Sequence, residues 1–233
     1  FRIGEASENI ESKFTSYWTA LESISRDVFP NEKGDDASVI TAVVPCISSD
    51  YVCKKLKTFI TALHNTNKTS IPMPGENRNI RGISNTDFYS LLKHQDFSQA
   101  ILSEINDYPY FQHRLSSFIE YCQNPVLMGI AIESHEEKVV RQLKRLYRAR
   151  NVIVHNADSV EGLNLLCATL EHYFKGCINS LVDLMSEIKT IESPKEGFIR
   201  YKNLIRNAKI ELNPDLKKGR KPGEVRKTNR SPQ

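Results

Sequence analysis

The feature that most restricts the fold of this chain is a helical pattern that runs, with one break, from Ser134 to Ile188. Before the break, apolar residues recur at spacings of three and four on one face, and basic residues occupy the opposite face. The apolar positions are Val139, Val140, Leu143, Leu146, Tyr147 and Val154, and the basic ones are Arg141, Lys144, Arg145 and Arg148. After a break at 156–159, a second apolar stripe extends from Leu163 to Ile188. Such stripes need other helices to pack against, so the pattern predicts an all-α, up-and-down bundle.

The rest of the chain carries the same periodicity in shorter segments. Helices are expected over 5–28, from Asp35 or Asp36 to Pro45, from about 50 to 63, over 85–105 and over 111–121. Residues 64–84 are rich in Pro, Gly, Asn and Ser and predict a long surface loop, and Asn124-Pro125 predicts the start of another. No convincing strand alternation and no Gly-rich phosphate loop is present. We expect one helical domain over 1–195 and a C-terminal extension over 196–233 that ends in a flexible basic tail.

Composition indicates a folded protein with no membrane segment. Hydrophobic residues make up 39% of the chain and charged residues 26%. No apolar run approaches the roughly 18 residues of a membrane span, and no signal peptide is recognisable, so we expect a cytoplasmic protein. The five cysteines lack C-x-x-C spacing and are expected to be buried thiols rather than disulfides or zinc ligands. The chain begins at Phe1, which suggests a piece of a longer protein.

The net charge of +4 is unevenly distributed. Residues 214–233 hold seven Lys or Arg against two acidic residues, a balance of +5, which leaves about −1 for the rest. The body therefore offers no broad basic surface to nucleic acid, and any attraction to phosphate has to be local, in a patch or in the tail. The tail is equally well explained as a solvated terminus.

Arg150 differs from the other arginines of its segment. On a helical wheel it falls between Leu146 and Val154, on the apolar stripe, whereas its basic neighbours point away. A buried guanidinium needs a partner. A core carboxylate or solvent reached along the side-chain stem would suffice; a dimer partner or an anionic ligand is the functional alternative.

His155 follows Arg150 in the order Arg-Asn-x-x-x-His, and the pair suggests a reaction. Cleavage of a phosphodiester without metal needs a fixed cation for the phosphoryl oxygens and a group that exchanges a proton near neutral pH; Arg and His are suited to these roles. In RNA the 2′-hydroxyl supplies the nucleophile. The other histidines have no acid or Cys neighbours at metal-ligand spacing, so no metal or cofactor is expected.

The residues that carry this chemistry resemble the HEPN superfamily, whose signature is an Arg followed by a short gap and a His. Phe14-Thr-Ser-Tyr-Trp-Thr-Ala-Leu-Glu22 is similar to the segment that opens the Apea-like branch. The resemblance covers about residues 5–190 and implies a HEPN-like helical bundle with long inter-helix loops. It also implies a metal-independent endoribonuclease whose site is formed across a homodimer and whose products carry a 2′,3′-cyclic phosphate and a 5′-hydroxyl.

Carried onto this chain, the family motif makes Arg150 the phosphate-binding cation and His155 the general acid and base. Asn151 is the auxiliary polar residue, and Glu22 is expected to orient Arg150 or to form a structural ion pair. RNA is the expected substrate, in a toxin or antiviral defence system, and an antitoxin or an upstream sensor domain is the further candidate partner. The alternative is a non-catalytic HEPN module for dimerisation or sensing. A third is a nucleotide-modified toxin whose activity is held off by a partner, with Tyr147 as the modified residue, although Tyr147 is more simply explained as a core residue.

Overall fold

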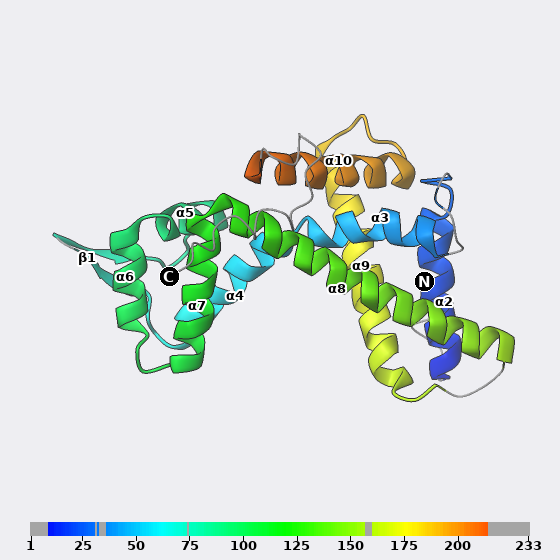
Figure 1. Ribbon diagram of the computed structural model, residues 1–233, viewed down its shortest axis with the longest axis horizontal. Coiled ribbons are helices and arrows are strands. Elements are labelled where there is room, and N and C mark those ends of the chain that lie inside the picture. The colour runs from blue at the N-terminus through cyan, green and yellow to red at the C-terminus, as the bar shows by residue number, and fades with distance from the viewer. Residues whose placement is uncertain (1–8, 31, 33–35, 74, 157–159, 214–233) are drawn as a thin grey trace, which may run out of the picture. The chain divides into compact units, whose positions relative to one another are not determined.

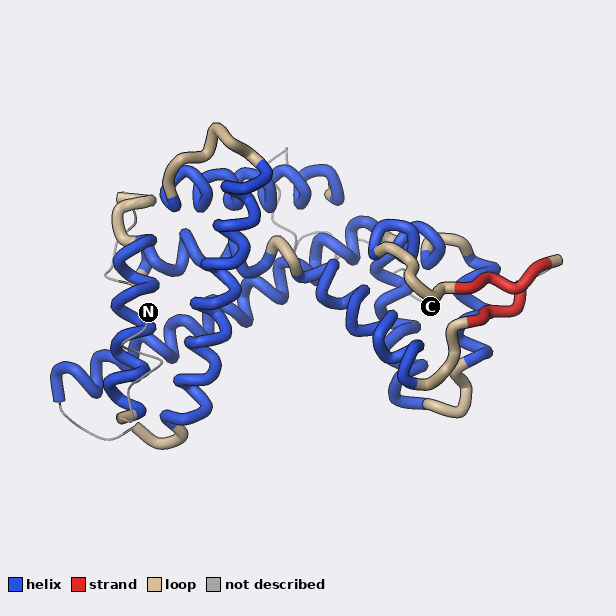
Figure 2. The backbone as a smooth tube through the Cα atoms, turned by 180° about the vertical axis from the view of Figure 1, so that it is seen from behind, coloured by secondary structure: helices blue, strands red, loops and turns tan. Residues whose placement is uncertain are grey.

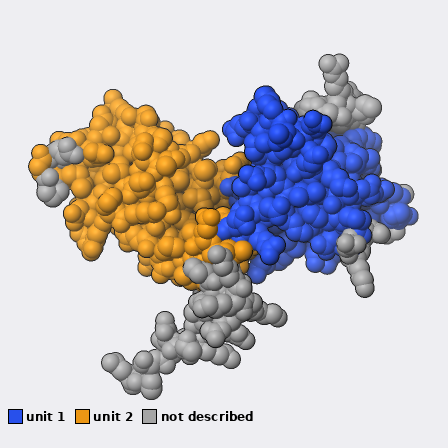
Figure 3. Space-filling view, turned by 90° about the horizontal axis from the view of Figure 1, so that it is seen from above, with its two compact units in different colours: residues 1–49, 134–207 blue, residues 50–133, 208–233 orange. Residues whose placement is uncertain are grey.

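The computed structural model describes residues 9–213 except 31, 33–35, 74 and 157–159. In this part of the chain the structure is built from α-helices and one two-stranded hairpin, so the predicted all-α fold is confirmed (Figure 1). The chain forms two compact units (Figure 3). Unit 1 comprises residues 1–49 and 134–207, and unit 2 comprises 50–133 and 208–233. The sequence did not indicate this division. The basic tail lies outside the described residues.

Unit 1 is a group of crossing helices around one apolar core. It holds α2 (Ile10–Ser25), α3 (Ala37–Ser48), the main part of α8 (Pro125–Asn151), a π-helical turn (Val152–Asn156), α9 (Leu163–Glu187) and most of α10 (Pro194–Leu212). Helix α9 packs against both α2 and α3. Most of the predicted stripe of α9 is buried, namely Leu163, Leu166, Cys167, Leu170, Phe174, Cys177 and Leu181. Its other members, Ile178, Met185 and Ile188, are half-buried, and Leu184 is buried in addition.

Helix α2 shows how the local sequence determines the fold. Its N-cap Asn9 accepts bonds at Oδ1 from the backbone N–H groups of Glu11 (2.8 Å) and Ser12 (3.3 Å), which satisfies two otherwise unpaired donors. The aromatic and leucine residues at i, i+3, i+4 and i+7 then face the core: Phe14, Tyr17, Trp18 and Leu21. Each buried side chain contributes roughly 1.5–3 kcal/mol, so this face holds α2 in place.

Helix α10 approaches α9 closely at a glycine. A Cβ atom placed on Gly197 would lie 2.6 Å from Cδ2 of Leu181, so the close packing of α10 on α9 requires a residue without a side chain at this position. Tyr201, one turn further on, donates a hydrogen bond from its hydroxyl to the carbonyl of Ser180 at 2.7 Å. Phe198 lies in the core of unit 1. Residues beyond 195 thus contribute to this unit.

Unit 2 has a separate core, made by short helices and a hairpin. It holds α4 (Tyr51–Asn65), β1 (Ser70–Met73), β2 (Glu76–Asn79), α5 (Asn85–Leu92), α6 (Gln95–Glu104), α7 (Pro109–Gln123) and the first turns of α8. The two strands are antiparallel, with Ile71 opposite Arg78 (Figure 2). The prediction of a structureless loop over 64–84 was therefore wrong in its centre. Ile71 and Ile80 are fully buried and attach the hairpin to the unit.

Two further predictions about boundaries were wrong. Asn124-Pro125 does not begin a loop: Asn124 Oδ1 accepts from the backbone N–H of Val126 at 3.1 Å, and α8 starts at Pro125. Proline is favourable in a first helical turn because its missing N–H has no partner there anyway. Pro45 does not end α3, which continues to Ser48.

No helix in the described ranges is long and apolar enough to cross a membrane.

Candidate functional site

The end of α8 separates Arg150 from the other basic residues of that helix. Arg141, Lys144, Arg145 and Arg148 are exposed, whereas Arg150 is only partly accessible. Ala149 and Leu146 beside it are buried. Arg150 is thus half-buried beside buried neighbours, in contrast to the exposed basic residues of the same helix.

The helix changes its winding directly after Arg150. Residues Val152–Asn156 form a π-helical turn, in which hydrogen bonds join residues five apart instead of four. On a regular α-helix, Arg150 and His155 would lie far apart around the axis, but a π turn brings residues i and i+5 to the same side. The run Val152-Ile153-Val154 favours this change, since β-branched side chains are poorly suited to regular α-helix. Such turns recur at functional sites.

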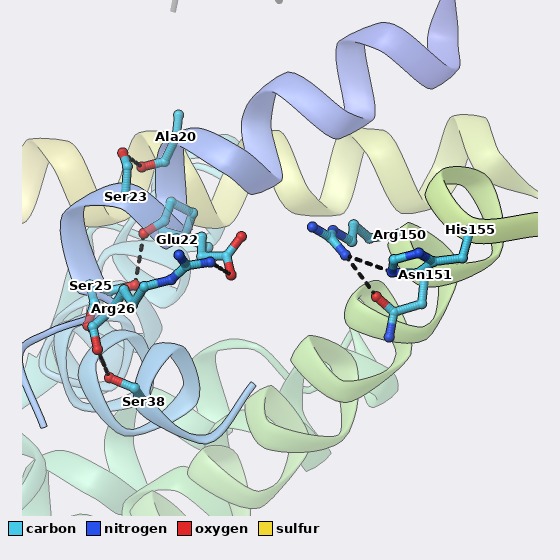
Figure 4. A network of polar contacts seen from close by, with 10 residues as sticks. Ala20, Glu22, Ser23, Ser25, Arg26, Ser38, Arg150, Asn151 and His155 are labelled. Atoms are coloured by element: carbon cyan, nitrogen blue, oxygen red, sulfur yellow. Dashed lines mark hydrogen bonds and ion pairs between the residues drawn. The ribbon is translucent and has the colours of Figure 1, made fainter. Parts of the chain in front are cut away.

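The turn brings the three motif residues into contact (Figure 4). Nη1 of Arg150 donates to Oδ1 of Asn151 at 3.1 Å and lies 3.4 Å from Nε2 of His155. A guanidinium can only donate, so a hydrogen bond between these two atoms requires the tautomer of His155 in which Nε2 accepts. His155 is exposed. The unit thus places an imidazole and a guanidinium side by side, with the imidazole at the surface.

The Arg150 guanidinium also has a donor that no described residue satisfies. Its Nε atom is buried and has no hydrogen-bond partner there. Because most buried polar groups are paired, such an atom calls for an explanation, and functional sites are one place where unsatisfied groups persist. Arg150 is therefore oriented by two neighbours on its own helix end, and no ion pair with a carboxylate is found in the described part of the chain.

Glu22 does not contact Arg150 in this structure. Its carboxylate binds the guanidinium of Arg26, one turn further along α2, at 2.6 Å. In Figure 4 the Glu22–Arg26 pair is separate from the contacts of Arg150 with Asn151 and His155, and no contact is drawn between Glu22 and Arg150. Of the two roles considered for Glu22, the geometry favours the local ion pair.

An aromatic pair, Trp18 and Tyr147, packs close to the site. The sequence pattern did not predict that these two rings contact each other. The ring of Tyr147 packs against Trp18 of α2, with centroids 5.7 Å apart. Trp18 is 1% exposed, and its Nε1 is buried without a hydrogen-bond partner among the described residues. Tyr147 lies on the same face of α8 as Arg150, so the contact fixes the last turns of α8 against α2. The core role considered for Tyr147 is consistent with this packing.

Among the described residues, no group of three or more His, Cys, Asp or Glu is placed to hold a metal ion. Comparisons with protein-family models, with curated proteins and with solved structures find no match for this chain.

Proposed function

We propose that this chain is a HEPN-like, metal-independent endoribonuclease in which Arg150 and His155 form half of a site completed by a second copy. The observation that carries the proposal is the 3.4 Å approach of Arg150 Nη1 to His155 Nε2 at an exposed π turn. The arrangement supplies both groups that the reaction needs. Asn151 adds a third polar group, which holds the guanidinium in place.

The chemistry follows from these groups. The imidazole of His155 takes the proton from the RNA 2′-hydroxyl, and the 2′-oxygen attacks the neighbouring phosphorus. The bond from phosphorus to the 5′-oxygen breaks, and that oxygen leaves with a proton from an acid. The products are a 2′,3′-cyclic phosphate and a 5′-hydroxyl. Arg150 stabilises the charge that develops on the phosphoryl oxygens, which donors in such positions do by a factor of about 10²–10³.

A second copy explains how one histidine serves two roles. A single imidazole cannot be a deprotonated base and a protonated acid in the same step, whereas two copies supply one of each. A twofold homodimer places identical residues opposite each other. Val154, next to His155, is 45% exposed, an apolar side chain that a second copy would cover.

The test is cleavage of single-stranded RNA in the presence of EDTA. We expect Arg150→Ala and His155→Ala to abolish cleavage while helicity and oligomeric state stay unchanged. The controls are Arg148→Ala on the same helix and His172→Ala on α9, both at exposed positions. Cleaved wild-type products should accept a 5′-phosphate directly from polynucleotide kinase. The proposal fails if the wild type cuts no RNA, or if both site variants cut as fast as the controls.

Mixing experiments test the composite site separately. When wild type and His155→Ala are combined in equal amounts and allowed to exchange, about one quarter of random dimers contain two intact histidines. Activity should fall to that fraction of the activity of wild type alone at the same total concentration. A fall to about one half would show that each copy works independently and would contradict the shared site.

A further inference from the structure

A polar pocket in unit 2 is lined by none of the residues of the candidate functional site. It has a volume of about 520 Å³, within the range of small-ligand sites. One wall is β2 and the loop that follows it, and the other is one face of α5 with the residue that precedes α6. Only Ile83 and Leu91 contribute apolar side chains. This lining is poorly suited to an apolar metabolite.

The hairpin wall is fixed to the unit, so its polar groups are held in place. Ile71 and Ile80 are fully buried at its base, and the backbone N–H of Ile80 donates to the carbonyl of Thr69 at 2.9 Å. Asn79 Oδ1 accepts from the backbone N–H of Arg81 at 2.8 Å, which leaves its Nδ2 group to donate elsewhere.

Arg81 is the main cationic group of the pocket. Its Nε donates to Oγ1 of the buried Thr69 at 3.2 Å, which orients the guanidinium. No carboxylate pairs with Arg81 in the described part of the chain, so its Nη groups keep their capacity for an anion. Arg78 on β2 contributes a second guanidinium to the lining.

The single carboxylate of the lining is already engaged. Asp87 Oδ2 accepts from the hydroxyl of the N-cap Ser84 at 2.7 Å, and Asp87 lies in the first turn of α5, where the helix dipole compensates a negative charge. Because Asp87 is engaged and Arg81 has no carboxylate partner among the described residues, Arg81 remains able to bind an anion in this pocket. His94 at its rim is exposed and offers a ring on which a base can stack.

We infer that this pocket binds a phosphate and an adjoining base of single-stranded RNA. Guanidinium groups recognise phosphate oxygens, and amide and aromatic side chains recognise unstacked bases. The inference rests on the proposed function for the identity of its ligand, because the shared chemistry, a phosphate beside a base, would also fit a free nucleotide. Unit 2 is thus a second RNA contact, separate from the reacting groups of unit 1.

The test measures binding without cleavage. The probe is a fluorescent single-stranded RNA with 2′-O-methyl groups, which lacks the nucleophile, and the readout is anisotropy of the full chain across a salt series. We expect the double variant Arg78→Gln, Arg81→Gln to weaken binding about tenfold or more and to lower the salt dependence by about one to two ions. The matched control is Lys54→Gln, Lys57→Gln, which removes the same charge from exposed positions on α4 of the same unit.

The outcomes separate this inference from the proposed function. Equal binding by the pocket variant and the control, with both folded by circular dichroism, overturns the pocket. Displacement of the RNA by AMP at concentrations near the RNA dissociation constant also overturns it, in favour of a free-nucleotide site. If the pocket variant loses binding although the wild type never cleaves RNA, the pocket stands and the nuclease proposal fails. If Arg150→Ala abolishes cleavage while the pocket variant binds RNA normally, the nuclease proposal stands and the pocket inference fails.

Discussion

Replacing Arg150 by Met tests whether this arginine serves stability or function. Methionine keeps an unbranched apolar stem of similar length and removes every donor. Two contacts of Nη1 are lost, to Asn151 at 3.1 Å and to His155 at 3.4 Å, and hydrogen bonds of this kind contribute about 0.5–1.5 kcal/mol each. The substitution also removes the buried, unsatisfied Nε donor, whose desolvation costs about 1–3 kcal/mol. These two contributions are similar in size and opposite in sign.

We therefore expect Arg150→Met to unfold within about 1 kcal/mol of the wild type while RNA cleavage is lost. The assay is urea unfolding followed by circular dichroism, at one fixed chain concentration because association would stabilise the fold. Arg148→Met, at an exposed position, is the control and should change the free energy of unfolding by less than about 0.5 kcal/mol. A destabilisation of about 3 kcal/mol or more would show that Arg150 is a structural cation, and the reasoning from its unsatisfied donor would be refuted.

Two other expectations follow from packing. Gly197→Ala gains about 1 kcal/mol of helix propensity, but its Cβ meets Leu181 at 2.6 Å, and overpacking costs about 1–3 kcal/mol, so unfolding should become easier by roughly 1 kcal/mol. In a Leu181→Ala background, Gly197→Ala should leave the free energy of unfolding unchanged or raise it. The same urea unfolding assay measures both effects. Among the cysteines only Cys53 is exposed, and burial raises the pKa of the Cys122 thiol to about 12, so a disulfide reagent at pH 8 should label one thiol per native chain. Labelling that persists in Cys53→Ser would contradict the assigned burial.

Helical periodicity proved sufficient to predict the fold class and the buried face of α9. The stripe residues are neighbours on the helix surface, so their burial follows from local geometry alone. The hairpin was missed because its strands are four residues long and contain polar and proline residues, too short for alternation to be visible. Asn-Pro predicts a turn from sequence alone, whereas in the structure Asn124 caps α8 and Pro125 is its first residue.

For the site, the helical wheel separates Arg150 from the other basic residues of α8, and in the structure Arg150 is half-buried whereas those residues are exposed. The wheel could not predict that His155 lies on the same side of the helix as Arg150, because the π turn changes the number of residues per turn within the motif itself. The run of β-branched residues at 152–154 was the available signal. The partner of Glu22 was missed, although Arg26 stands four residues further along the chain, which is the spacing of a helical ion pair. One wall of the pocket in unit 2 is formed by the hairpin, so the pocket could not be predicted without the hairpin.

The division of unit 1 into residues 1–49 and 134–207 affects how the protein is made. During synthesis the aromatic face of α2 emerges early, but its main partner, α9, is translated only after the whole of residues 50–133. Contacts between segments so distant in sequence form slowly, and an exposed apolar face is prone to aggregation in the interval. Unit 2, whose core draws mainly on one continuous stretch, can fold on the ribosome first. We therefore expect nascent chains that end before Leu163 to require a chaperone that covers Phe14 and Trp18.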